Sequence, residues 1–351
     1  MSEKATIRDV AQRAQTSVAT VSRVLNQVDY PVSAALRKRV EEAAEALDFT
    51  MNDGRKKKAA TRQTVGLVIP TLSNPYYVQT LQGISSVCQE QGYGLLVCDT
   101  QNSLQKEQRF LQDLYACKAS GVILSSLSED KNFLAEYVWR GMLIIQLDQR
   151  VEIDGGYSIN FDSRRGARMA VKCLQEKGHT RIALASTPIT RWTRKQIRKG
   201  YLEQMQSAAL STGEEFIFIS ESTPSSLEEN PEIAAGKSIA QRISAEKRGI
   251  TAVLCVNDML AIGLMRGLRE CGVRIPEDIS VIGFDDIPIA STLTPSLTTI
   301  HCPSYETGRL SAMMLLDQIK NRSAAGSTRF PITMNLQPSL IERESVADIR
   351  K

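Results

Sequence analysis

The sequence predicts an α/β protein in which a small all-helical N-terminal domain precedes two doubly wound parallel-sheet lobes. The chain has 351 residues, a length that suggests two or three domains. Its whole formal charge of +4 lies in residues 1–62, which hold twelve Lys or Arg against eight Asp or Glu. From Thr64 onward, apolar runs alternate with helical stretches, and this alternation is typical of parallel sheets covered on both faces.

The composition excludes several classes of protein. Hydrophobic residues make up 42% and charged residues 23%, which are ordinary values for a globular chain. No apolar run reaches the roughly 18–20 residues that cross a bilayer, and the N-terminus lacks the apolar core of a signal peptide. The seven cysteines form no CxxC pair, and there are only two histidines. We therefore expect a cytoplasmic protein with reduced thiols, no metal site and no cofactor.

The basic N-terminal domain, residues 1–50, is predicted to contain three helices. Thr6 is a plausible N-cap for an apolar-faced helix over residues 6–14, and Ser17 for a second helix directly after a polar break. A third amphipathic helix starts near Ser33. Two short helices joined by a tight turn are the layout of a helix-turn-helix, and a basic domain on a neutral body indicates a polyanionic partner.

In a helix-turn-helix the second helix enters the major groove of DNA. Its outward positions here are Val18, Ala19, Ser22 and Arg23, and Arg23 can make a bidentate contact to guanine worth about 1–3 kcal/mol of discrimination. The hydroxyl and amide side chains suited to phosphates are Thr6, Ser17, Thr20, Ser22 and Asn26. A plain three-helix bundle with a solvated charged face explains the same pattern.

A basic linker, residues 51–63, follows this domain. Its cations include Arg55, Lys56, Lys57 and Lys58. They either follow DNA phosphates, which would add to the salt dependence of binding, or form a solvated tether.

The neutral body contains eight predicted strands. These are residues 65–70, 94–100, 121–127, 143–148, 181–186, 216–220, 252–258 and 280–286. About 285 residues exceed one comfortable core, so we expect two lobes.

Polar side chains gather where these strands end, which is where open parallel sheets bind ligands. The candidate ligand-binding residues are Asn74, Tyr76, Asp148, Arg150, Asp162, Arg191, Arg194, Asp258 and Asp285. Carboxylates and amides facing arginines and aromatic rings suit a polyhydroxylated ligand. Helix or turn capping is the competing explanation for Asn74, Asp258 and Asp285.

Several stretches resemble the LacI/GalR family of bacterial transcriptional regulators. They are TIRDVAQRAQTSVATVSRVLN in the basic domain and NPYY, LQEKGHTRIALAS, VNDMLAIGLMRGLRECGVRIPEDISVIGFDD and LTPSLTTI in the body. The resemblance covers nearly the whole chain. It implies that Val18, Ala19 and Arg23 read an operator and that the body is a periplasmic-binding-protein type I-like effector domain.

The resemblance also implies domain boundaries and ligand contacts. Three crossovers near 160–162, 288–294 and 322–330 would divide the body into a first lobe of residues 64–160 plus 292–324 and a second lobe of residues 161–291 plus 325–345. The implied effector contacts are Tyr76, Asp148, Arg150, Asp162, Asp258 and Asp285.

The sequence departs from the family pattern at three places. Gln15 stands in the turn where the family often has Gly, and Lys58 falls where it has a Leu that wedges into the minor groove. Ile197 occupies a position where the family commonly has an effector-clamping Arg. Gln15 is tolerated if its backbone does not become left-handed.

Three arginines flank Ile197 and can substitute for the missing one: Arg191, Arg194 and Arg198. The Thr193-Arg194 pair is similar to one in family members that respond to keto-sugar acids. An anionic sugar is therefore one expected effector.

The leading hypothesis is a bacterial repressor, cytoplasmic and nucleoid-associated when bound, that recognises a palindromic operator as a homodimer under control of a small sugar or sugar-acid effector. An enzyme is disfavoured because no GxGxxG follows a strand and neither GxxxxGK[ST] nor GxSxG occurs. A solute-binding or sugar-processing α/β protein without a DNA role is the alternative that shares the fold of the body.

Overall fold

The computed structural model describes residues 5–25, 32–47, 49, 63–128, 130–149, 156–220, 230–246, 248–321 and 331–350. The chain forms two compact units, Met1–Arg62 and Gln63–Lys351. Each has its own hydrophobic core, and the core of the first unit draws only on residues before Arg62. No helix in the described part of the chain is long and apolar enough to span a membrane.

The first unit contains helices α1 (Ile7–Arg13), α2 (Val18–Leu25) and α3 (Ala34–Ala46). Val10, Val21 and Val40, one from each helix, are fully buried together. The N-cap predictions for Thr6 and Ser17 are confirmed: Thr6 forms a capping box with Asp9, and the Ser17 hydroxyl accepts from the Thr20 amide. The third helix starts at the expected place, where the Ser33 hydroxyl accepts from the Leu36 amide. Local sequence therefore sets all three helix starts.

The turn between α1 and α2 needs a left-handed backbone at Gln15, a conformation that glycine adopts more easily than glutamine. Gln15 has φ 50°, in the left-handed region, so the condition for its easy tolerance is not met. The Arg39 guanidinium from α3 donates to the carbonyl of Ala14 at 2.8 Å, and a second donation reaches the carbonyl of Gln15. These contacts stabilise the strained turn.

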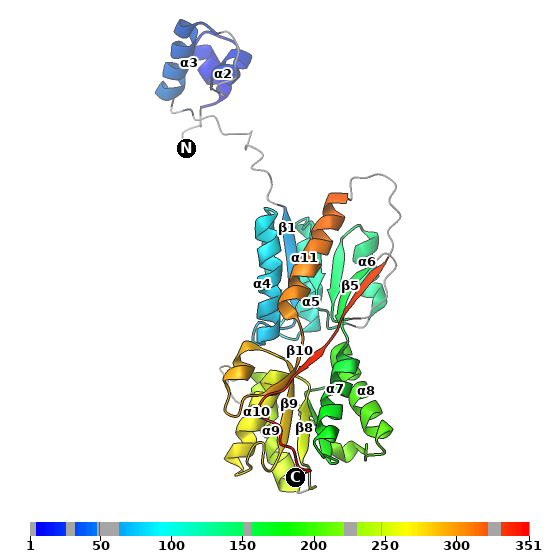
Figure 1. Ribbon diagram of the computed structural model, residues 1–351. Helices are drawn as coiled ribbons and strands as arrows, with labels where there is room; N and C mark the ends of the chain where they lie inside the picture. Colours follow the sequence, from blue (N-terminus) through cyan, green and yellow to red (C-terminus); the bar gives the residue numbers. More distant parts are fainter. Residues whose placement is uncertain are drawn as a thin grey trace. The chain divides into compact units, whose positions relative to one another are not determined.

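The second unit contains two six-stranded sheets, each with its own helices (Figure 1). The sheet of the first lobe has the order β11-β5-β4-β3-β1-β2, and all its strands are parallel. Its strands are β1 (Thr64–Ile69), β2 (Gly94–Asp99), β3 (Gly121–Leu124), β4 (Ile144–Leu147), β5 (Tyr157–Phe161) and β11 (Ile332–Leu336). Its helices are α4 (Pro75–Glu90), α5 (Leu104–Ala116), α6 (Lys131–Trp139) and α11 (Ser304–Asn321).

The sheet of the second lobe has the order β12-β10-β9-β8-β6-β7, with β12 antiparallel to β10. Its strands are β6 (Ile182–Ser186), β7 (Ile217–Ile219), β8 (Ala252–Cys255), β9 (Ser280–Asp285), β10 (Thr298–His301) and β12 (Ser339–Ile341). Its helices are α7 (Ser163–Glu176), α8 (Trp192–Ser207), α9 (Pro231–Glu246) and α10 (Asp258–Glu270), with short 3-10 turns η1 (Glu214–Phe216) and η2 (Pro288–Thr292).

Two of the three expected crossovers lie elsewhere. The first crossing, between β5 and α7, is at the expected place. The second lies between His301 and Ser304 rather than at 288–294, because β10 pairs with β9 of the second lobe. The third lies between Leu336 and Ser339 rather than at 322–330, because β11 pairs with β5 of the first lobe. The expected boundaries at 292, 324 and 325 are therefore wrong.

Candidate nucleic-acid interface and ligand pocket

The exposed face of α2 carries the side chains predicted to meet DNA bases. Val18, Ala19 and Arg23 are all exposed, and Val18 is 41% exposed although it is apolar. The small core accounts for this orientation, because Val21 and Val24 occupy the opposite face. The helix therefore presents two short apolar side chains and one guanidinium to solvent, a combination suited to thymine methyls and a guanine edge.

The hydroxyl residues around α2 have structural roles as well. The Ser17 hydroxyl bonds the Thr20 hydroxyl at 2.9 Å, and the Thr6 hydroxyl donates to Asp9 at 2.7 Å. Ser22 is half-buried on the same helix. The predicted DNA contacts Asn26, Arg55, Lys56, Lys57 and Lys58 lie outside the described residues.

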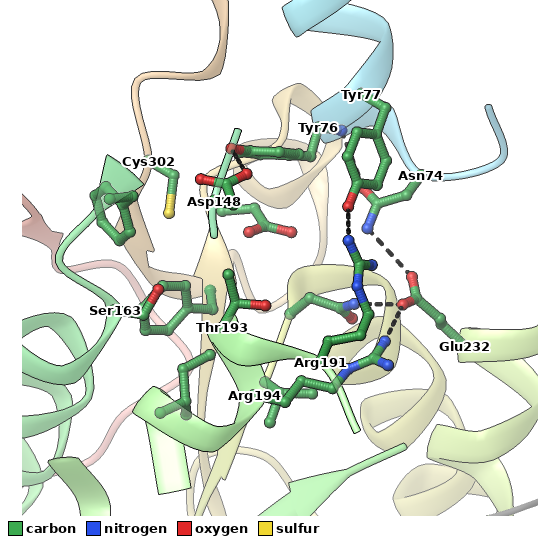
Figure 2. Close-up of a pocket in the computed structure, with 16 residues that line it drawn as sticks. Asn74, Tyr76, Tyr77, Asp148, Ser163, Arg191, Thr193, Arg194, Glu232 and Cys302 are labelled. Carbon is green, nitrogen blue, oxygen red and sulfur yellow. Dashed lines mark hydrogen bonds and ion pairs between the residues drawn. The ribbon is translucent and has the colours of Figure 1, made fainter. Parts of the chain in front are cut away.

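A polar pocket lies between the two lobes of the second unit (Figure 2). Its lining residues from the first lobe and the first crossover are Asn74, Tyr76, Tyr77, Asp148, Phe161 and Ser163. Those from the second lobe and the second crossover are Arg191, Thr193, Arg194, Ile197, Glu232, Val256, Asn257, Phe284, Asp285 and Cys302. The carboxyl ends of β1, β4, β8 and β9 all deliver residues to it, as parallel sheets lead one to expect.

One end of the pocket is rich in carboxylates. The Tyr76 hydroxyl donates to Asp148 Oδ2 at 2.6 Å, and burial raises the pKa of both groups. Asp148 Oδ1 is buried without a partner among the described residues. Burial also raises the pKa of Asp285, with Asp258, Glu232 and Asp148 adding to the effect. A raised pKa favours the neutral carboxylic acid, so this end of the pocket can offer a ligand an O–H donor as well as acceptor oxygens.

The backbone at these carboxylates is unusual. Asp148 has φ 54° and Asp285 has φ 113°, both in the region that favours glycine. Each residue ends or follows a strand that is tightly held in its sheet. Such outliers cluster at binding sites, where the surrounding fold holds them in place.

The other end of the pocket is cationic. The Arg191 guanidinium donates to the Tyr77 hydroxyl and, at 3.3 Å, to the Ser125 hydroxyl, so it reaches from the second lobe to the first. It also lies 5.7 Å from the centroid of the Tyr77 ring. Arg194 pairs with Glu232 at 3.1 Å, with both side chains less than 18% exposed. Burial lowers the pKa of Arg194.

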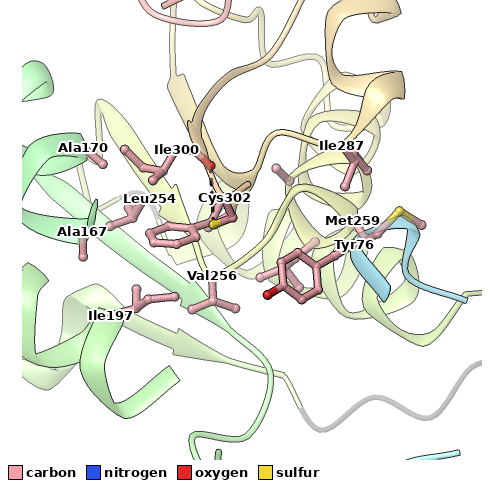
Figure 3. Packing of buried hydrophobic residues seen from close by; sticks show 14 of the residues in the cluster. Tyr76, Ala167, Ala170, Ile197, Leu254, Val256, Met259, Ile287, Ile300 and Cys302 are labelled. Atoms are coloured by element: carbon pink, nitrogen blue, oxygen red, sulfur yellow. Dashed lines mark hydrogen bonds between the residues drawn. The ribbon is translucent and has the colours of Figure 1, made fainter. Parts of the chain in front are cut away.

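Ile197 belongs to the apolar wall of the pocket. It is 2% exposed and packs near Val256 and Cys302, where the pocket adjoins the hydrophobic core (Figure 3). Phe161 and Phe284 meet edge to face at 5.8 Å on the same wall. Arg191 and Arg194 line the same pocket as Ile197. Arg198 does not substitute, because it pairs with Glu214 on the surface.

Six of the nine predicted ligand-binding residues line the pocket: Asn74, Tyr76, Asp148, Arg191, Arg194 and Asp285. Asn74 also caps α4, because its Oδ1 accepts from the Tyr76 amide at 3.0 Å. Its amide nitrogen donates to Glu232 Oε2 at 3.2 Å, so the same side chain caps a helix and takes part in the polar lining of the pocket. Arg150 lies outside the described residues.

Two predicted ligand-binding residues do not line the pocket. Asp162 caps α7 by accepting from the Arg165 amide at 2.9 Å, and it lies in a separate recess beside the first crossover. Asp258 is fully buried behind the pocket, where it accepts from the Thr299 hydroxyl at 2.6 Å and from the Ile287 amide at 2.9 Å. Its carboxylate is used internally, so it does not face a ligand in this structure.

Glu232 is the main pocket residue that sequence reasoning missed. It lies in the first turn of α9 and accepts from side chains of both lobes. The sequence does show that Asn230-Pro231 is a typical helix start and that Glu232 follows it directly, in the first turn of the helix. Nothing in the sequence indicated that this helix start faces the pocket.

A helix-turn-helix unit joined to a two-lobed α/β unit with a polar pocket between the lobes defines a ligand-responsive DNA-binding regulator. Residues 6–52 match the model for bacterial regulatory proteins, lacI family, and residues 171–346 match the periplasmic binding protein-like domain. The chain belongs to the lacI family. It is a DNA-binding transcriptional repressor and not an enzyme.

Repressors of similar sequence match this chain over almost its whole length. The HTH-type transcriptional repressor PurR of Vibrio cholerae serotype O1 (strain M66-2) is 30% identical over 350 residues, 99% of each chain. The protein of the same name from Aliivibrio fischeri (strain MJ11) is 32% identical over 347 residues, 97% of this chain and 98% of that one. This full-length similarity to repressors excludes the alternative of a body without a DNA role.

Solved structures agree with the fold. The transcriptional regulator CelR–cellobiose complex superposes with a TM-score of 0.70 at 26% identity, covering 97% of this chain and 99% of that one. The lac repressor dimer bound to operator and the anti-inducer ONPF gives a TM-score of 0.69 at 26% identity, covering 98% and 100%.

Replacing Arg23 by Ala should weaken sequence discrimination at one base pair of each half-site. The expected loss is about 1–3 kcal/mol, since one bidentate guanine contact disappears while phosphate contacts remain. Binding-site selection with wild type and Arg23→Ala measures it, and Arg13→Ala on α1 serves as the matched cationic control. An unchanged preference at every position would refute base reading by Arg23.

Proposed function

We propose that this chain binds a palindromic operator as a homodimer and that a small sugar or sugar acid held between the lobes controls its affinity. The observation that carries the proposal is the pocket itself, whose polar lining comes from both lobes. A ligand there contacts both lobes at once. It therefore favours one lobe arrangement over another, which is the differential affinity that allosteric control requires.

Hydrogen bonds between the lobes support control by a ligand bound between them. Asn230 of the second lobe donates to the Ser73 carbonyl of the first at 3.0 Å, and Arg191 bonds Tyr77 and Ser125 across the same boundary. These contacts are hydrogen bonds, which polar groups of a ligand can also form. A ligand can replace or reinforce them, and the relative described as a CelR–cellobiose complex supports a sugar as that ligand.

An exposed apolar edge supports the dimer. Strand β2 is the edge of the first-lobe sheet, and Leu96 and Val97 on it are 45% and 40% exposed. An uncovered hydrophobic edge strand favours self-association. A two-fold dimer would present two copies of α2 to the half-sites of a palindrome.

We assign to the linker contacts with the DNA backbone that do not depend on the base sequence. Arg55, Lys56, Lys57 and Lys58 would follow phosphates, and each phosphate neutralised would steepen the fall of affinity with salt. The protein would act in the bacterial cytoplasm, where the operator lies.

Selection of bound duplexes from a random library tests the DNA part of the proposal, and thermal-shift screening of sugars and sugar acids tests the effector part. We expect a palindromic site and a ligand that changes operator affinity. Selection of a single asymmetric half-site would contradict the dimer. A stabilising ligand that leaves operator affinity unchanged would contradict the control.

A further inference from the structure

Glu232 lies at the centre of a set of hydrogen-bond donors that joins the two lobes (Figure 2). Its Oε1 accepts from Asn257 Nδ2 at 2.6 Å and from Arg194 Nη2 at 3.1 Å, both in the second lobe. Its Oε2 accepts from Asn74 Nδ2 at 3.2 Å, in the first lobe. The side chain is only 17% exposed.

Two amide groups and a guanidinium arranged around one carboxylate are the donor set with which proteins hold a ligand carboxylate. Here the chain supplies the carboxylate itself. The second pocket arginine is engaged too, because Arg191 donates to the hydroxyls of Tyr77 and Ser125. A ligand carboxylate would therefore have to displace Glu232 or lie beside it.

The groups facing the pocket include the carboxyl groups of Asp148 and Asp285, whose oxygens can accept hydrogen bonds from a ligand. Asp148 Oδ1 has no partner among the described residues, and Asp285 stands at the same end of the pocket. Acceptors in a buried site need donors from the ligand, and hydroxyl groups supply them without bringing a charge. The apolar wall of Phe161 and Phe284 suits the C–H faces of a sugar ring.

We infer that Glu232 is an internal anion that occupies the position of an effector carboxylate and makes the pocket selective for neutral polyhydroxylated effectors over sugar acids. This inference rests on the proposed effector site and narrows its ligand class. It also gives Glu232 a second role, because the same carboxylate links Asn74 of the first lobe to Arg194 and Asn257 of the second.

The selectivity test uses Glu232→Gln and Glu232→Ala, with Glu214→Gln as the control. Glu214 forms an Arg–Glu ion pair on the surface of the same lobe, so the control removes similar chemistry away from the pocket. Each protein is titrated with matched pairs that differ only in a carboxylate, such as glucose with glucuronate and galactose with galacturonate.

We expect the wild type and the control to favour the neutral member of a pair. Removing the internal charge should shift the preference toward the carboxylated member by about tenfold or more, the size of one charge-assisted contact. A wild type that binds the sugar acid more tightly, or a preference that Glu232→Gln leaves unchanged, overturns the inference.

A second measurement needs no effector and so separates failure of this inference from failure of the proposed function. Formate is added to Glu232→Ala as a free carboxylate, with chloride at the same ionic strength for comparison, and amide hydrogen exchange is followed over α4 and α8. We expect faster exchange in the variant and restoration by formate but not by chloride. Wild-type exchange rates in Glu232→Ala, or equal effects of the two anions, overturn the role of Glu232 even if no sugar binds.

Discussion

Removing residues 1–62 should abolish operator binding while leaving the remaining unit folded and able to bind its effector. The expected loss of specific affinity is at least about a thousandfold, because both the base-reading helix and all of the net positive charge are removed. The remainder should fold because its cores contain no residue of the first unit and because it forms a separate compact unit.

Gel-shift titration with the selected operator measures the loss, and thermal unfolding with and without ligand checks the remaining unit. The full chain carrying Arg23→Ala is the control, since it should keep nonspecific affinity for DNA that the truncated chain lacks. Sequence-specific duplex binding by residues 63–351 alone would overturn the assignment of the DNA-binding role to the first unit.

Replacing Asp258 by Ala should lower the free energy of unfolding by about 3 kcal/mol at or below about pH 4, where the acid is protonated in the folded and the unfolded state, without removing a ligand contact. The substitution leaves the Thr299 hydroxyl and the Ile287 amide without their acceptor, and both residues are buried. An unsatisfied buried polar group costs about 1–3 kcal/mol. Denaturant unfolding measures the loss, and stabilisation by effector should persist in the folded variant.

Asp258 should also make stability depend on pH. Burial raises its pKa to about 7 in the folded protein, above the value of about 3.9 that is usual in unfolded chains. Between these values the folded state holds a proton that the unfolded state has lost. Its contribution to stability is therefore complete below about pH 4 and declines as the pH rises to about 7, by an amount on the order of 4 kcal/mol.

Asp258→Asn is the matched variant, since its amide can donate to Thr299 while its oxygen accepts from Ile287, as in the protonated acid. It should fold well and show a flatter dependence of stability on pH than wild type. An unchanged pH profile would contradict the titration of Asp258. If the variant folds but is no longer stabilised by the effector, Asp258 must contribute to effector binding after all.

The sequence was most informative where structure depends on near neighbours. Thr6, Ser17 and Ser33 start their helices because each hydroxyl or capping box bonds amides within three residues. The eight expected strands are all present, and seven of them are largely buried, as continuous apolar runs require; β2, at the edge of its sheet, is partly exposed. Strands β5, β10, β11 and β12 were not expected. β11, for example, is partly exposed, so it carries weak hydrophobic patterning.

The sequence by itself determined the basic helical unit, the parallel-sheet class of the body and six of the pocket residues, since each follows from local patterning or from the position of strand ends. The tertiary structure decided which lobe receives β10 and β11, because those pairings join strands far apart in the chain. It also decided that Asp258 is turned inward while Glu232 faces the pocket. Both are carboxylates at helix starts, and only the packing around each helix fixes the direction of the side chain.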